Sequence, residues 1–134
     1  MRRTHMNDIG VIGGSKKKQD LAYSIIDFCI AKMMPRMKTL DITLYLSNDM
    51  EDADGFCMAE SKRMFVLEVD SRLKGDDFIT ALCHEMVHVK QYAKGELDVN
   101  GKFAYKSVDD YLNAWYEKEA YAMQETLCAE FLGK

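Results

Sequence analysis

Two histidines and a glutamate near the middle of the chain have the types and the spacing of a metal site. His84, Glu85 and His88 form the pattern His-Glu-x-x-His. In an α-helix with about 3.6 residues per turn, residues four apart project from the same side, one turn apart. His84 and His88 can then bind one zinc ion, and Glu85 can take a proton from a water molecule held beside it. The spacing therefore predicts zinc chemistry if this segment is helical.

The residues around the motif have a helical pattern. Apolar residues recur at helical spacing on both sides of it, Asp76 or Asp77 can cap the beginning, and Gly95 offers a left-handed end. The apolar residues occupy one arc of this helix, and His84 and His88 lie on its flank. We therefore expect the histidines to face a groove at the edge of the core, where a metal ion could meet water and substrate.

A catalytic zinc ion usually has three protein ligands and keeps its fourth position for water. The remaining histidine, His5, lies in an N-terminal stretch without periodicity, so the third ligand is expected to be a carboxylate. Glu119 shares an arc with the apolar residues of the last predicted helix, whereas Glu117 lies on the opposite side. The other candidates are Glu125, Glu130, Asp98, Asp109 and Asp110.

The choice among these carboxylates rests on the cost of burial. A carboxylate that is buried on a packing face has a high free-energy cost of desolvation unless it is paired or bound to a metal. Zinc would explain why Glu119 lies on such a face, so the periodicity favours Glu119 as the third ligand. An ion pair between Glu119 and a lysine or arginine at the edge of the core is the alternative explanation.

The other elements indicate an α+β domain. Residues 1–15 are interpreted as a mobile leader, and residues 16–134 as one domain with a small three-stranded sheet. An exposed edge of this sheet could pair with an extended peptide, although the pattern leaves open which strand forms the edge. The predicted order is a helix at residues 19–34, a strand at 40–46, a hairpin of strands at 55–59 and 64–70, the His-Glu-x-x-His helix, and a last helix from 107 to about 131.

Composition limits the class of protein. The chain has 134 residues, 48% of them hydrophobic and 30% charged, which suits one globular domain. Its net charge of -4 gives no reason to expect a nucleic acid partner. It contains neither an apolar run of about 20 residues nor the apolar core of a signal peptide, so we expect no membrane partner and a cytoplasmic location. Four separate cysteines are expected to be reduced thiols: Cys29, Cys57, Cys83 and Cys128.

The segment from His84 to His88, followed by Glu119-Ala120 in a later helix, resembles the gluzincin clan of zinc metallopeptidases. The order of elements resembles the minimal zincin-like core over about residues 18–132, and is most similar to small single-domain metallopeptidases of bacterial and phage genomes. This resemblance implies zinc as the cofactor, His84, His88 and Glu119 as its ligands, and Glu85 as the general base. The chain lacks the third histidine of SprT-like proteases and the longer histidine signature of metzincins.

We therefore expect a zinc-dependent metallopeptidase that hydrolyses a peptide or protein substrate. Glu85 would remove a proton from the attacking water and pass it to the departing amine. A tyrosine could donate a hydrogen bond to the tetrahedral intermediate. A catalytically silent, zinc-stabilised protein-binding module is the first alternative, and a metal-free domain is the second; the presence of Glu85 favours the peptidase. The candidate tyrosines are Tyr105, Tyr111 and Tyr116.

Overall fold

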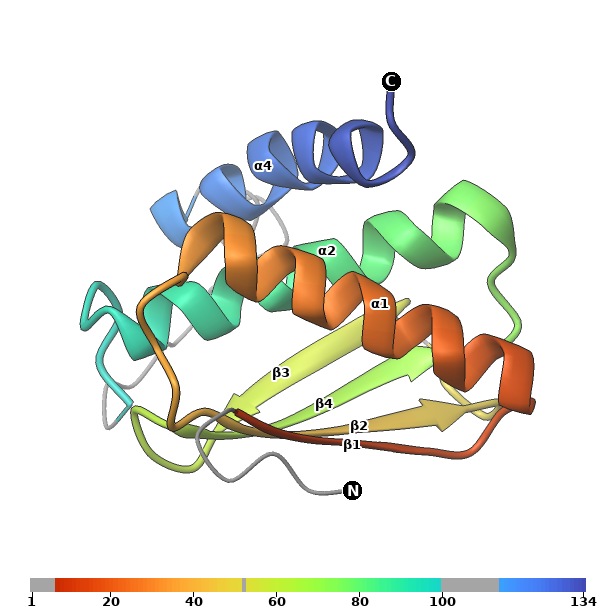
Figure 1. Ribbon diagram of the computed structural model, residues 1–134, viewed down its shortest axis with the longest axis horizontal. Helices are drawn as coiled ribbons and strands as arrows, with labels where there is room; N and C mark the ends of the chain where they lie inside the picture. The colour runs from red at the N-terminus through yellow and green to blue at the C-terminus, as the bar shows by residue number, and fades with distance from the viewer. Residues whose placement is uncertain (1–6, 52, 100–113) are drawn as a thin grey trace.

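The computed structural model describes residues 7–51, 53–99 and 114–134 as an α+β arrangement of one sheet and the helices that cover it. The strands form a single four-stranded sheet in the order β1-β2-β4-β3. All the helices of the described residues lie on one side of this sheet (Figure 1). The elements are β1 (Asp8–Ile12), α1 (Lys16–Met33), β2 (Asp41–Ser47), β3 (Gly55–Ala59), β4 (Met64–Asp70), α2 (Gly75–Ala93) and α4 (Trp115–Phe131).

The core lies between the sheet and the helices. Alternate residues of the two central strands, β2 and β4, are buried, because successive side chains of a strand point to opposite faces. Helix α2 lies against the sheet with one face, and α4 packs on α2 farther from the sheet (Figure 1). The buried residues that α2 contributes therefore come from nearly its whole circumference. The inward residues of the central strands are Ile42, Leu44, Leu46, Phe65, Leu67 and Val69.

The N-terminal residues form a fourth strand, which corrects the prediction of three strands and of a leader at residues 1–15. Strand β1 pairs in parallel with β2, with Ile9 opposite Ile42. The Asn7 side chain anchors its beginning, because it donates a hydrogen bond to the Met37 carbonyl and accepts one from the Leu40 amide. Residues 1–6, including His5, lie outside the described residues.

The leader prediction was wrong because the evidence for β1 is not local. The strand is short and contains a glycine, so its apolar alternation is weak. Its pairing partner lies about thirty residues away and is connected to it through a whole helix, α1, as parallel strands require. Ser15 then caps α1, since its hydroxyl accepts a hydrogen bond from the Lys18 amide at 3.1 Å.

The remaining boundaries differ little from the predictions. Both strands of the hairpin begin and end where the pattern placed them, and within the described residues β3 pairs only with β4. Helix α2 begins at Gly75, so Asp76 and Asp77 occupy its first turn and do not cap it. Gly95 has the expected positive φ, 75°. The last helix begins at Trp115, after Ala114 in an extended conformation, so a helix that runs without interruption from Ser107 is not observed; Ser107 itself lies outside the described residues. No helix among those described is long and apolar enough to cross a lipid bilayer.

Strand β1 offers a direct test of the corrected fold. Ile9 packs against the core, whereas Ile12 on the same strand is 51% exposed. We expect Ile9→Ala to lower the free energy of unfolding by about 1–2 kcal/mol, and Ile12→Ala to change it by less than about 0.5 kcal/mol. Denaturant unfolding of both variants measures the difference. Equal, negligible effects would indicate a leader that does not contribute to the core.

Candidate metal centre

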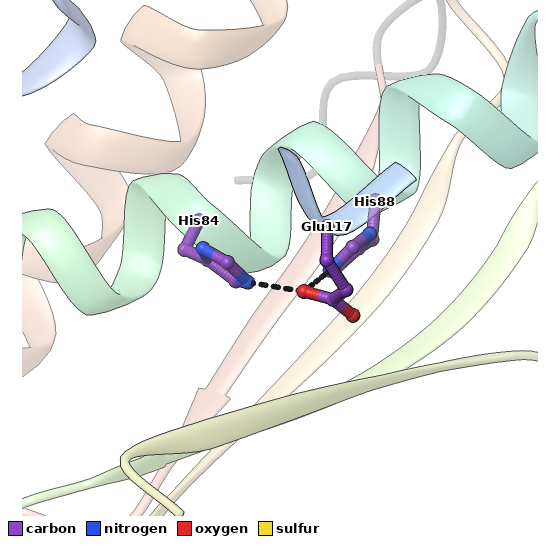
Figure 2. A group of neighbouring side chains, drawn as sticks. All are labelled: His84, His88 and Glu117. Carbon is purple, nitrogen blue, oxygen red and sulfur yellow. Dashed lines mark hydrogen bonds and ion pairs between the residues drawn. The ribbon is translucent and has the colours of Figure 1, made fainter. Parts of the chain in front are cut away.

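Helices α2 and α4 bring two histidines and a carboxylate together. His84 and His88 lie one turn apart on α2, and the Glu117 carboxylate of α4 lies between their rings (Figure 2). Oε1 of Glu117 is 3.0 Å from Nε2 of His84 and 3.3 Å from Nε2 of His88. All three residues are buried. Within the part of the chain that the structure describes, this is the group of residues that could hold a metal ion.

The spacing of these atoms suits a zinc ion. One ligand atom from each residue lies within 4.8 Å of the others. Zinc has bonds of about 2.0–2.1 Å to histidine nitrogen and carboxylate oxygen, so two ligand atoms of a tetrahedral site lie about 3.3 Å apart. The two nitrogen–oxygen distances at Glu117 are close to that value. The donor set, two imidazoles and one carboxylate, is also one that zinc binds with an open position for water.

The charges and hydrogen bonds of the group stabilise a positive charge at its centre. Burial by itself would raise the pKa of Glu117, but hydrogen bonds from His84 and His88 and their charges outweigh it and lower that pKa to about 2. Burial would lower the pKa of His88, but the hydrogen bond to Glu117 and the nearby carboxylates raise it. Glu117 is therefore ionised, and positive charge beside it is stabilised, whether a proton or a metal ion supplies that charge.

Glu117 occupies the place that periodicity assigned to Glu119, which corrects the choice of third ligand. Glu119 is half-buried and its Oε1 accepts hydrogen bonds from Lys90 and Gln91, both at 3.0 Å. The ion pair with Lys90 is the alternative explanation that the sequence allowed for Glu119. Two other acidic candidates are also engaged elsewhere: Glu130 pairs with Lys32, and Glu125 accepts a hydrogen bond from Gln124. Asp109 and Asp110 lie outside the described residues.

The error concerns the rotation of α4 about its axis. The prediction centred the packing face on large aromatic residues, including Trp115, which is 50% exposed. The buried face is instead rotated by roughly a quarter turn and contains small residues. Glu117 then points at α2, and Glu119 lies at the margin of the interface. The buried residues of α4 are Tyr116, Glu117, Ala120, Leu127 and Cys128.

Three residues that were not predicted as part of the site contact the two histidines, two of them at Nδ1, the ring nitrogen that faces away from Glu117. The side-chain oxygen of Gln91 is 2.8 Å from Nδ1 of His88, and that of Gln124 is 2.7 Å from Nδ1 of His84. The ring of Tyr121 lies 4.6 Å from the ring of His84. Helical spacing along the sequence could have indicated the two glutamines. Gln91 follows His88 by three residues, and Gln124 follows Glu117 by seven, on the same face of its helix.

Glu85 lies beside the three ligand candidates, on the side of α2 that meets the sheet edge. Its carboxylate packs against Gly55 of β3, where a Cβ would lie 3.3 Å from Oε2 of Glu85 and 2.8 Å from the Glu68 carbonyl oxygen. A glycine at this position therefore allows the strand to approach the helix closely. Burial raises the pKa of Glu85 to about 7, although His88 and His84 oppose the shift.

A cavity of about 200 Å³ opens over these groups. His84, Glu85, His88 and Glu117 form its polar wall, and residues 55–57 of β3 form another. Its remaining lining is largely aromatic and apolar: Tyr92, Leu97 and Tyr116. Of the predicted tyrosine donors, Tyr116 lines the cavity, whereas Tyr105 and Tyr111 lie outside the described residues. Tyr92, one turn after His88, is a further candidate donor that helical spacing could have indicated.

No protein-family model, curated protein or solved structure matches this chain.

The ligand assignment predicts opposite effects for two glutamates on the same helix. Glu117→Ala removes a carboxylate from the centre of the group, so we expect the variant to lose its zinc. Glu119→Ala removes a residue held by Lys90, so we expect both it and wild type to keep about one zinc ion per chain. Elemental analysis of proteins purified without added metal compares them. Zinc lost in Glu119→Ala and kept in Glu117→Ala would reverse the assignment.

The pKa of Glu85 predicts how the stability of the metal-free protein depends on pH. Because the folded-state pKa is raised from 4.5 to about 7, the unfolded chain releases this proton first, and stability falls as pH rises between these values. We expect wild type to lose about 2–3 kcal/mol relative to Glu85→Gln over this interval, at about 1.4 kcal/mol per pH unit. The raised pKa of His88 adds a decrease above pH 6.5 in both proteins.

Urea unfolding after removal of metal, at several pH values, measures these curves. Glu117 does not interfere, because its lowered pKa affects stability only below about 4.5. Parallel curves for wild type and Glu85→Gln would contradict the raised pKa of Glu85.

Proposed function

We propose that this protein is a zinc-dependent peptidase of the gluzincin type, built on a minimal zincin-like core, with His84, His88 and Glu117 as ligands and Glu85 as general base. One observation carries the proposal. A buried group of two imidazoles and a carboxylate lines the same cavity as a second carboxylate whose pKa lies near neutrality. A purely structural metal site has no need of this second carboxylate.

Glu85 has the properties required of the base. When bound, zinc supplies a Lewis acid that polarises the peptide carbonyl and acidifies the attacking water. Glu85 takes the proton of that water as the carbon–oxygen bond forms, and then transfers it to the nitrogen of the departing amine as the peptide bond breaks. A pKa near 7 suits a group that must both accept and release a proton near neutral pH. Tyr92 and Tyr116 are the candidates in the cavity wall for a hydrogen bond to the carbonyl oxygen.

Strand β3 is the edge that best suits an extended peptide. It is the last strand of the sheet on the side of the metal centre, and residues 55–57 of it line the cavity. A peptide that pairs with β3 through main-chain hydrogen bonds would lie across the cavity, with a carbonyl beside the metal ligands. The other edge strand, β1, lies across the sheet and does not line this cavity.

The cavity also favours a class of substrate. The side chains of Phe56, Tyr92 and Leu97 in its wall are aromatic or apolar. A volume of about 200 Å³ suits one large side chain. We therefore propose that the peptide carries an apolar side chain next to the cleaved bond.

The proposal predicts that two substitutions separate metal binding from turnover. Glu85→Gln keeps the ligands and removes the base, so we expect it to retain zinc and to lose activity by about 10²–10⁴-fold. His88→Ala removes a ligand, so we expect it to lose both. A mixed library of fluorescence-quenched peptides, incubated with each zinc-loaded protein, measures turnover, and elemental analysis measures zinc.

Glu96→Gln is the control, since Glu96 lies on the surface and, within the described residues, its side chain pairs with Lys90. It should retain both zinc and turnover. Hydrolysis that persists in Glu85→Gln would rule out Glu85 as the base. Zinc in wild type without cleavage of any peptide in the library would favour the protein-binding module.

A further inference from the structure

Each imidazole of the metal centre makes two contacts on opposite sides of its ring. Nε2 of both rings faces Glu117, as described above. Nδ1 of His88 faces the side-chain oxygen of Gln91, and Nδ1 of His84 faces that of Gln124. Gln91 belongs to α2 and Gln124 to α4. Two glutamines from different helices thus hold the two rings in the same way, each with its side-chain oxygen facing Nδ1.

The hydrogen bonds of Gln91 determine which way its amide points. Its Nε2 donates to the main-chain oxygen of Tyr116 at 2.9 Å and to Oε1 of Glu119 at 3.0 Å. Both of these atoms are acceptors, because the first is a carbonyl oxygen and Oε1 of Glu119 also accepts a hydrogen bond from Lys90 at 3.0 Å. The amide nitrogen must therefore face them, and the amide oxygen must face His88. An amide oxygen only accepts, so Nδ1 of His88 carries the hydrogen.

Gln124 repeats this arrangement at the other histidine. Its Nε2 donates to Oε1 of Glu125 at 3.2 Å, which leaves its oxygen directed at Nδ1 of His84. Gln124 is half-buried, whereas Gln91 is fully buried. In both rings the hydrogen on Nδ1 leaves Nε2 on the side of Glu117, where Nε2 donates to the carboxylate while it carries a proton and would offer its lone pair to a metal ion that replaces this proton.

We propose that Gln91 and Gln124 are positioning residues, which hold His88 and His84 with hydrogen on Nδ1 and so present both Nε2 atoms to the metal ion. This inference rests on the metal centre of the proposed function. The partners are neutral amides, so they orient the rings without adding negative charge to the site. Glu119 is linked to the centre through Gln91, whose amide it helps to orient, and not as a ligand. Outer hydrogen bonds of this kind typically change metal affinity by 10–100-fold.

The test removes each acceptor while keeping the length of the side chain. Gln91→Met and Gln124→Met each lose the oxygen that faces Nδ1, and we expect the zinc affinity of each to fall by about 10–100-fold. Competition with a chromophoric zinc chelator measures the affinity. Gln124→Glu restores an acceptor oxygen, so it should recover most of the affinity. Gln19→Met is the matched control, because the Gln19 side chain lies on α1 and donates to the Gly13 carbonyl, away from the metal centre.

A second readout separates ring positioning from general stability. Nitrogen-15 chemical shifts of the imidazoles in zinc-loaded wild type should show hydrogen on Nδ1 of both rings, and the signal of the affected ring should change in each variant. A loss of stability alone would not produce this change. Because Gln91 is fully buried, Gln124→Met decides the question if Gln91→Met does not fold.

The outcomes distinguish this inference from the proposed function. Zinc bound by wild type with unchanged affinity in the folded methionine variants overturns the positioning role and leaves the peptidase proposal standing. Weaker zinc binding in the variants without peptide cleavage by wild type supports the positioning role and removes the peptidase. Wild type that binds no zinc overturns both.

Discussion

The structure depends on one buried carboxylate. Glu117 lies in the interface between α2 and α4, where an isolated negative charge would cost several kcal/mol. It is stable there because two imidazoles of α2 meet the same oxygen atom. This requirement fixes how α4 is rotated and how it is placed along α2.

The sheet supports this interface from the other side of α2. Helix α2 packs on the sheet against β3 and β4, and its flank with His84 and His88 faces α4. At the edge of the sheet, Gly55 lets β3 approach Glu85 closely. The cavity is therefore built from one edge strand and two helices that are distant in sequence. A metal ion would join two of these elements, so its binding would stabilise the contact between α2 and α4.

The accuracy of the sequence-based predictions follows the range of the interactions involved. His84, Glu85 and His88 belong to one helix, and their relation to each other follows from helical spacing alone. The hairpin of β3 and β4 was also local, and its bounds were predicted correctly. The sequence-based prediction missed strand β1, because this strand is recognised by its pairing with β2, and α1 separates the two strands in the chain. Glu117 was passed over because hydrophobicity ranked Trp115 as a packing residue, although a partner on another helix decides which face is buried. The predicted last helix does not run without interruption from Ser107, because Ala114 is extended and α4 begins at Trp115.

The two buried carboxylates of the site differ in a way that supports their proposed roles independently of the motif. Glu117 lies between two imidazoles and is ionised, with its pKa lowered to about 2. Among the described residues no cation is hydrogen-bonded to Glu85 in this way, and burial raises its pKa to about 7. A ligand must be a carboxylate at all working pH values, whereas a base must gain and lose a proton near neutrality. A bound cation would lower the pKa of both groups, yet Glu85 would remain the more basic of the two. Exchange of the two roles would require Glu117 to leave the imidazoles on which its burial depends.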